Sequence, residues 1–104
     1  MASKKPQQGD IVLIPFPFTD LSGTKVRPAI VVNKQSSGAD SIVVFITSKK
    51  YTKGIPIESD VLKKTSYVLV NKVATLDNKL IAGKIGTLEG KTLKTVITEL
   101  KKQF

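Results

Sequence analysis

Apolar, β-branched segments recur at short intervals along the chain and alternate with turn-forming clusters. The apolar segments are residues 11–18 (IVLIPFPF), 29–33 (AIVVN), 41–47 (SIVVFIT), 66–70 (SYVLV) and 80–88 (LIAGKIGTL). Between them lie TDLSGTK, KQSSGAD and the longer SKKYTKGIPIESDVLKKT. This spacing predicts a mainly β fold, a small antiparallel barrel or sandwich. Because Pro15 and Pro17 cannot donate to a ladder, we expect the first strand to end near Ile14 or to run along an edge.

The last part of the chain changes to a helical period. One apolar stripe is formed at positions i, i+3, i+4 and i+7 by Leu93, Val96, Ile97 and Leu100. Lys101 and Lys102 follow it, and cations suit the negative end of a helix. We therefore expect a C-terminal helix over about 90–103, beginning within 89–92. The 104 residues suit one domain over 9–104, with residues 1–8 as a flexible basic tail.

A hairpin around the KQSSGAD turn makes a specific prediction of register. If the turn is centred near Ser37, the opposed residues are Asn33 with Ser41, Ile30 with Val44, and Arg27 with Thr47. Opposed residues in an antiparallel pair project from the same face, with Cβ atoms about 4.5–5.5 Å apart. Arg27 and Thr47 are therefore expected side by side at the far end of the hairpin.

Both faces of this hairpin are apolar. One face carries Ile30, Val32, Ile42, Val44 and Ile46, and the other carries Ala29, Val31, Val43 and Phe45. A strand pair buried on both sides needs a core on one and a helix or second subunit on the other. The pattern thus suggests a homodimer.

Composition narrows the chemistry. The chain has no cysteine and no histidine, which removes disulfides, thiolate chemistry, the usual metal ligand and the usual base at neutral pH. We expect neither a metal nor another cofactor. The net charge of +9 favours a polyanionic partner, nucleic acid before an acidic protein segment or an anionic membrane surface, although a merely lysine-rich surface would look the same.

No apolar run approaches the roughly 18 residues of a membrane span, and the start MASKKPQQGD has no apolar core of a signal peptide. We expect a cytoplasmic protein without a membrane partner.

Arginine is used once, at Arg27, against sixteen lysines. Arginine differs from lysine in being planar, permanently charged and able to hold a phosphate or a carboxylate with two parallel hydrogen bonds. General positive charge therefore does not explain Arg27, and we expect it to hold a specific anion.

The segment GDIVLIPFPFTDLSGTKVRPAIVV, followed by VVFITS and KVATLDNKLIAGKIGTL, closely resembles the PemK/MazF family of bacterial toxin endoribonucleases. The similarity runs from Gly9 to the C-terminal helix. It implies an SH3-like barrel with a C-terminal helix and a homodimer. It also implies metal-independent cleavage of single-stranded RNA, by attack of the 2′-hydroxyl on the adjacent phosphate, and neutralisation by a cognate antitoxin, for which we expect an acidic segment.

By this resemblance the catalytic arginine and threonine of the family fall on Arg27 and Thr47. Asp20, a candidate base, and Ser48 are candidates for supporting roles. We expect RNA contacts from the loops and basic positions: Thr19, Ser22, Lys25, Lys49, Lys50, Tyr51, Lys53 and Lys72. Two positions depart from the family pattern, with Ser22 where many members carry a carboxylate and Ala74 where many carry an arginine.

Two other functions fit the same pattern. One is a non-catalytic toxin of related fold, such as a gyrase poison. The other is an SH3-like module that binds nucleic acid without cutting it. Cleavage of RNA that depends on Arg27 would separate the enzyme from both.

Overall fold

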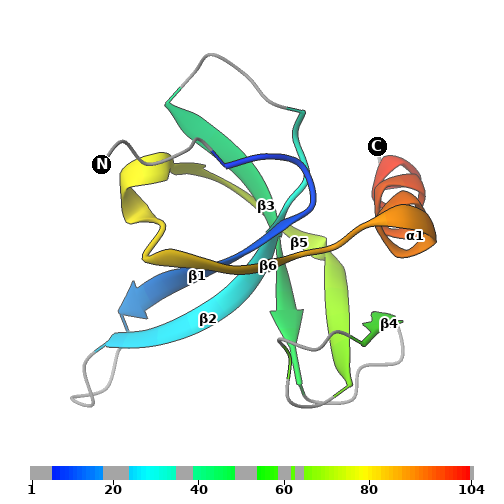
Figure 1. Ribbon diagram of the computed structural model, residues 1–104, viewed down its shortest axis with the longest axis horizontal. Helices are drawn as coiled ribbons and strands as arrows, with labels where there is room; N and C mark the ends of the chain where they lie inside the picture. The colour runs from blue at the N-terminus through cyan, green and yellow to red at the C-terminus, as the bar shows by residue number, and fades with distance from the viewer. Residues whose placement is uncertain are drawn as a thin grey trace.

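The computed structural model describes residues 6–17, 24–34, 39–48, 54–58, 62 and 65–103. Its elements are β1 (Asp10–Pro17), β2 (Thr24–Val31), β3 (Asp40–Thr47), β4 (Ile55–Ile57), β5 (Ser66–Asp77), the 3-10 turn η1 (Asn78–Leu80), β6 (Gly83–Thr87) and α1 (Gly90–Lys101) (Figure 1). Within the described residues, no helix has the length and apolar character needed to cross a membrane.

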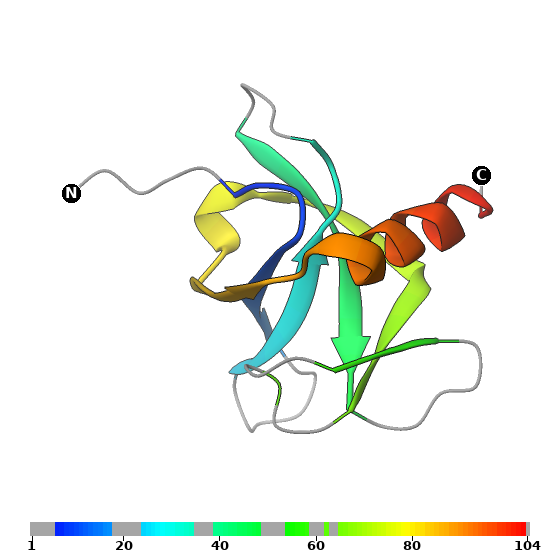
Figure 2. The ribbon, with the colours of Figure 1, turned by 45° about the vertical axis from the view of Figure 1, so that its right-hand side comes forward.

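The strands form one antiparallel sheet in the order β4-β5-β3-β2-β1-β6. In a flat sheet β5 and β6 would lie about 19 Å apart, four strand spacings. Only residues 78–82 connect them, and three of these form the compact turn η1. The sheet therefore curls, so that β5, η1 and β6 wrap around β1 (Figures 1 and 2). The predicted fold, a mainly β, small SH3-like antiparallel barrel with a C-terminal helix, is confirmed, and its six strands form a half-barrel.

β1 continues through both of its prolines. It pairs with β2 as far as Pro17, whereas its pairing with β6 ends at Leu13. The carbonyl of Leu13 accepts a hydrogen bond from the Ala82 amide on the β6 side. Because backbone groups alternate sides along a strand, Pro15 and Pro17 also face that side, beyond the last β6 pair. The expectation that the first strand runs along an edge is therefore right for the part beyond Leu13. The alternative, that it ends near Ile14, is wrong.

The β2–β3 hairpin has the predicted register. Ala29, Ile30 and Val31 oppose Phe45, Val44 and Val43. The Asn33 side chain accepts a hydrogen bond from the Ile42 amide at 3.1 Å, next to the turn.

Two hydrophobic clusters lie on opposite faces of this hairpin. The first packs Ile30, Val44 and Val68 against Val96 and Leu100 of α1. Ile42 lies on this face as predicted but is 38% exposed, because it lies near the turn at the start of β3.

The second cluster lies on the face away from α1. Its buried members are Val12, Ile14, Ala29, Val31 and Val43. Phe45, Ala74, Leu76 and Ile81 pack against it, so the curled second half of β5 and the residue after η1 cover this face. Burial on both faces is satisfied within one chain and does not by itself require a second subunit.

Three boundaries differ from the sequence prediction. β4 forms inside the segment expected to be a loop, because Ile55 and Ile57 pack into the first cluster. β5 runs on to Asp77, since its second half covers the second cluster. β2 begins at Thr24 rather than after the Arg-Pro pair.

The predicted C-terminal helix spans Gly90–Lys101, within the expected range.

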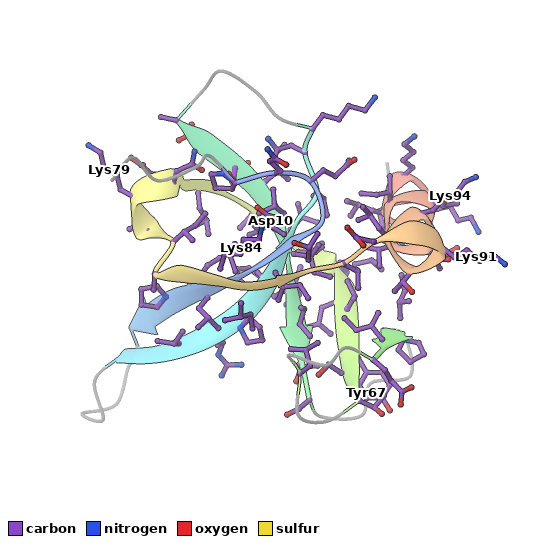
Figure 3. The ribbon with its side chains drawn as sticks, viewed as in Figure 1. Asp10, Tyr67, Lys79, Lys84, Lys91 and Lys94 are labelled. Atoms are coloured by element: carbon purple, nitrogen blue, oxygen red, sulfur yellow. The ribbon has the colours of Figure 1, made fainter. Side chains whose placement is uncertain are left out.

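The residues just before β1 are bonded to the sheet. Residues 1–5 lie outside the described residues, but the Gln7 amide donates to the Asp10 carboxylate at 2.9 Å and the Gln8 side chain donates to the Val32 carbonyl at 2.8 Å. Asp10 is buried and also contacts Lys84 at 3.2 Å, which links β1 to β6 (Figure 3). Residues 7–10 therefore belong to the folded domain.

Candidate active site

Arg27 is the fourth residue of β2 and lies on the face away from α1. It pairs with the buried Ile14 of β1, and its own side chain is half-buried. Side chains alternate along a strand, so Arg27 shares its face with Ala29 and Val31 of the second cluster. Because Arg27 pairs with β1 and lies inside β2, its backbone is held in position by the sheet.

Thr47, the last residue of β3, projects from the same face. It is half-buried and follows Val43 and Phe45 at the strand's period of two, and both of those residues contribute to the second cluster. Arg27 and Thr47 are therefore on one side of the sheet, toward the same end of the hairpin.

The hairpin ladder stops just before these two residues. The last β2–β3 pair is Ala29 with Phe45, and the same register extended by two positions would oppose Arg27 and Thr47. Beyond that pair the ends of β2 and β3 diverge, in both ribbon views (Figures 1 and 2). The register is thus as predicted, the shared face follows from it, and direct opposition of the two residues stays a prediction.

Pro28 accounts for the end of the ladder. The Val32 amide donates to the Ile42 carbonyl of β3, and alternation places the backbone of Ile30 and Pro28 on that same side. Proline has no amide hydrogen, so the next bond from β2 to β3 cannot form. The Arg-Pro pair therefore places an arginine where its strand leaves the hairpin.

Tyr67 is a residue of this face that the sequence analysis missed. It lies directly opposite Thr47 in the β3–β5 pairing and opposite Pro56 on the β4 side. Opposed residues share a face, so the half-buried ring of Tyr67 projects beside Thr47. The register between β3 and β5 is the only signal that reveals it, because 20 positions separate the two residues along the chain.

Three other candidates are among the described residues. Ser48 is exposed directly after β3, and Lys25 lies on β2 opposite Phe16. Lys72 is exposed on β5, where the pairing shifts between Leu69 and Val73.

Ala74 packs against the second cluster. This departure from the family pattern therefore places a small apolar side chain against the core. The remaining candidates, namely Thr19, Asp20, Ser22, Lys49, Lys50, Tyr51 and Lys53, lie outside the described residues.

Two other features of the described part of the chain bear on the site. It holds no group of three or more histidine, cysteine or acidic residues arranged to bind a metal ion. A groove of about 310 Å³ lies between α1 and the hairpin, lined in part by Val32, Ile42, Val73 and Ile97. Because these residues belong to the α1 side of the sheet, the groove is on the opposite face from Arg27 and Thr47.

Comparison with known proteins shows which family the chain belongs to. The model of the PemK-like, MazF-like toxins of type II toxin-antitoxin systems matches residues 7–104. The chain belongs to this PemK/MazF family. No curated protein sequence matches it.

Solved structures show the PemK/MazF fold at low sequence identity. A MazE–MazF complex from Deinococcus radiodurans is similar with a TM-score of 0.81 and 18% identity, covering 97% of this chain and 96% of the other. An endoribonuclease in complex with its cognate antitoxin, from a Mycobacterial species, gives a TM-score of 0.71 and 20% identity, covering 97% and 93%. These likenesses establish that the PemK/MazF chain has their fold over nearly its whole length.

Proposed function

We propose that this PemK/MazF chain is a toxin endoribonuclease that cleaves single-stranded RNA without a metal ion. The observation that supports it most directly is the placement of Arg27 and Thr47 on one face, at the diverging ends of β2 and β3. These are the two positions that match the family's catalytic pair. A guanidinium and a hydroxyl on one face suit a phosphodiester, because the first binds two phosphate oxygens and the second can orient the phosphate or the 2′-hydroxyl.

The proposed reaction is an internal transfer. The ribose 2′-oxygen attacks the adjacent phosphorus and loses its proton to a base, while the bond from phosphorus to the 5′-oxygen breaks and that oxygen takes up a proton. The products are a 2′,3′-cyclic phosphate and a free 5′-hydroxyl. Arg27 stabilises the negative charge that grows on the phosphate oxygens. Thr47 has no histidine to activate it, since the chain has none, and so serves to position rather than to accept the proton.

The proposed partners follow from charge and family. Two similar proteins were solved with antitoxins, and a net charge of +9 would attract an acidic antitoxin segment as well as RNA. A homodimer is the proposed assembly, which equilibrium sedimentation of the free protein would test.

Incubation with labelled single-stranded RNA in EDTA tests the activity. We expect cleavage with cyclic phosphate ends, and no cleavage of DNA of the same sequence, because DNA lacks the attacking hydroxyl. A substrate with one 2′-deoxy nucleotide at the cut should resist cleavage at that position alone. Binding without cutting, weakened by salt, would indicate a binding module instead. Growth arrest with intact RNA and trapped gyrase would indicate a gyrase poison.

Replacing Pro28 with valine tests whether the end of the hairpin ladder matters to the site. Valine restores an amide on the β3 side, so the ladder can extend and draw the ends of β2 and β3 together. We expect RNA cleavage to fall several-fold while the free energy of unfolding stays the same or rises slightly, since a backbone hydrogen bond contributes about 1 kcal/mol. Cleavage rates and urea unfolding, measured on the same preparation, check both halves. A stable variant with full activity would show that the separation of the strands is not needed.

A further inference from the structure

Tyr67 occupies the middle of a three-strand row next to the candidate catalytic pair. It is the second residue of β5, with Thr47 of β3 opposite it on one side and Pro56 of β4 on the other. Figure 3 places its ring at the end of the sheet where β3 terminates. Opposed residues have Cβ atoms about 4.5–5.5 Å apart, so the side chains of Tyr67 and Thr47 are direct neighbours across the two strands.

The neighbours of Tyr67 along β5 fix the direction of its side chain. Ser66 and Val68 are 5% and 0% exposed, and Val68 lies in the first cluster beneath α1. Alternation therefore directs Tyr67 away from α1, onto the face of Thr47 and Arg27. The side chain is only half-buried, so part of the ring remains accessible to a ligand.

Aromatic side chains gather on this face. Among residues whose side chains the structure describes, the aromatic ones are Phe45 and Tyr67. Phe45 lies opposite Leu69, two residues before Thr47 on β3, and packs against the second cluster. Tyr67 belongs to neither core cluster and lies opposite Thr47, the last residue of β3. An aromatic residue at an open position beside a phosphate site has the chemistry that proteins use to hold unpaired bases.

We propose that Tyr67 is the stacking platform for the base next to the scissile phosphate, an inference that rests on the proposed function. A phosphate bound between Arg27 and Thr47 carries its bases one sugar away on either side, and Tyr67 lies beside Thr47 at that range. Stacking holds the nucleotide while Arg27 and Thr47 engage the phosphate. Because every base has an aromatic face, this contact adds affinity and orientation with little choice of sequence. Tyr67 is a positioning residue for the bound RNA and takes no part in the proton transfers.

The composition of the chain allows a direct optical test. It contains two tyrosines and no tryptophan, so a Tyr51→Phe variant leaves Tyr67 as the sole strongly fluorescent side chain. The probe is the RNA cut by the wild type, with a 2′-deoxy nucleotide at the cut to prevent cleavage. We expect saturable quenching of Tyr67 emission as the base stacks on the ring. The same RNA with an abasic site next to the cut should bind more weakly and quench little.

Cleavage kinetics of two substitutions supply the second arm. Tyr67→Phe keeps the ring and should cut RNA within about threefold of the wild type. Tyr67→Val keeps a residue suited to a strand but removes the ring. It should lose roughly 5- to 100-fold in kcat/KM, the range expected for one stacked base, mostly through KM. Thermal unfolding of both variants identifies any loss that comes from folding.

The outcomes separate this inference from the proposed function. If the wild type cuts RNA but a folded Tyr67→Val variant cuts it equally well, and abasic and intact RNA quench alike, Tyr67 does not stack on the substrate and the proposed function still stands. If the Tyr67→Phe variant is as impaired as Tyr67→Val, the hydroxyl rather than the ring is needed, and stacking is overturned. Absence of any RNA cleavage by the wild type overturns the proposed function itself.

Discussion

The Arg27→Lys variant is expected to cleave RNA about 10²- to 10³-fold more slowly than the wild type, although it keeps the positive charge. Arg27 is anchored by strand pairing with Ile14 and can present two parallel N–H groups to two phosphate oxygens. A lysine places one mobile ammonium group there and cannot span both oxygens in a fixed direction. Single-turnover cleavage of a labelled RNA at saturating protein measures the chemical step separately from binding.

Loss of charge requires its own control. Arg27→Ala removes one cation from the candidate site, and Lys94→Ala removes one from the exposed side of α1 (Figure 3). If general charge were responsible, the two variants would slow cleavage alike. We expect Arg27→Ala to be at least as slow as Arg27→Lys and Lys94→Ala to stay within about twofold of the wild type, because an exposed charge outside the site adds only screened attraction. Full activity of Arg27→Lys would rule out the two-oxygen role.

The Gly9→Ala variant is expected to lose about 2–6 kcal/mol of unfolding free energy. Gly9 has φ +96°, and a Cβ there would lie 2.6 Å from the Leu88 carbonyl oxygen and 3.1 Å from Leu93 Cδ2. Both backbone strain and overpacking contribute, at about 1–3 kcal/mol each. The backbone cannot easily move away, because the Gly9 amide donates to the Val31 carbonyl at 2.8 Å and its carbonyl accepts from the Leu88 amide at 2.7 Å.

Gly90→Ala is the matched control for Gly9→Ala. Gly90 also has positive φ, +64°, but a Cβ built on it meets nothing within 4 Å. It should therefore cost only the backbone term, about 1–2 kcal/mol. Urea unfolding followed by far-ultraviolet circular dichroism compares the two variants. Equal losses would mean that contact with Leu88 and Leu93 contributes nothing and that φ alone requires glycine at position 9.

The sequence predicted well the features that depend on neighbours in the chain. The period of residues 93–100 indicated α1, and the KQSSGAD turn gave the register that pairs Ile30 with Val44. That register also places Arg27 and Thr47 on one face. In each case the determinant is a short segment whose apolar positions repeat with one period, so the pattern alone carries the information.

Features that depend on pairing between distant segments were not predictable. Tyr67 lies opposite Thr47 only because the β3–β5 pairing shifts between Leu69 and Val73, and a shift of one residue would have directed the ring to the other face. β4 was missed for a related reason, since three residues become a strand only when β5 is beside them. The effect of Pro15 and Pro17 on β1 could not be decided from the sequence either, because it depends on where the pairing with β6 ends, which is at Leu13.

The positions of the prolines also bear on how the protein behaves when concentrated. β4 is a sheet edge only three residues long, with Pro56 at its centre, and β1 beyond Leu13 is a second open edge whose missing donors are at Pro15 and Pro17. Long unbroken edges recruit strands from other molecules and lead to aggregation. These two edges are short or lack donors. They are therefore poor templates for edge-to-edge pairing with a second molecule, and neither has to be covered for the face that carries Arg27 to stay exposed.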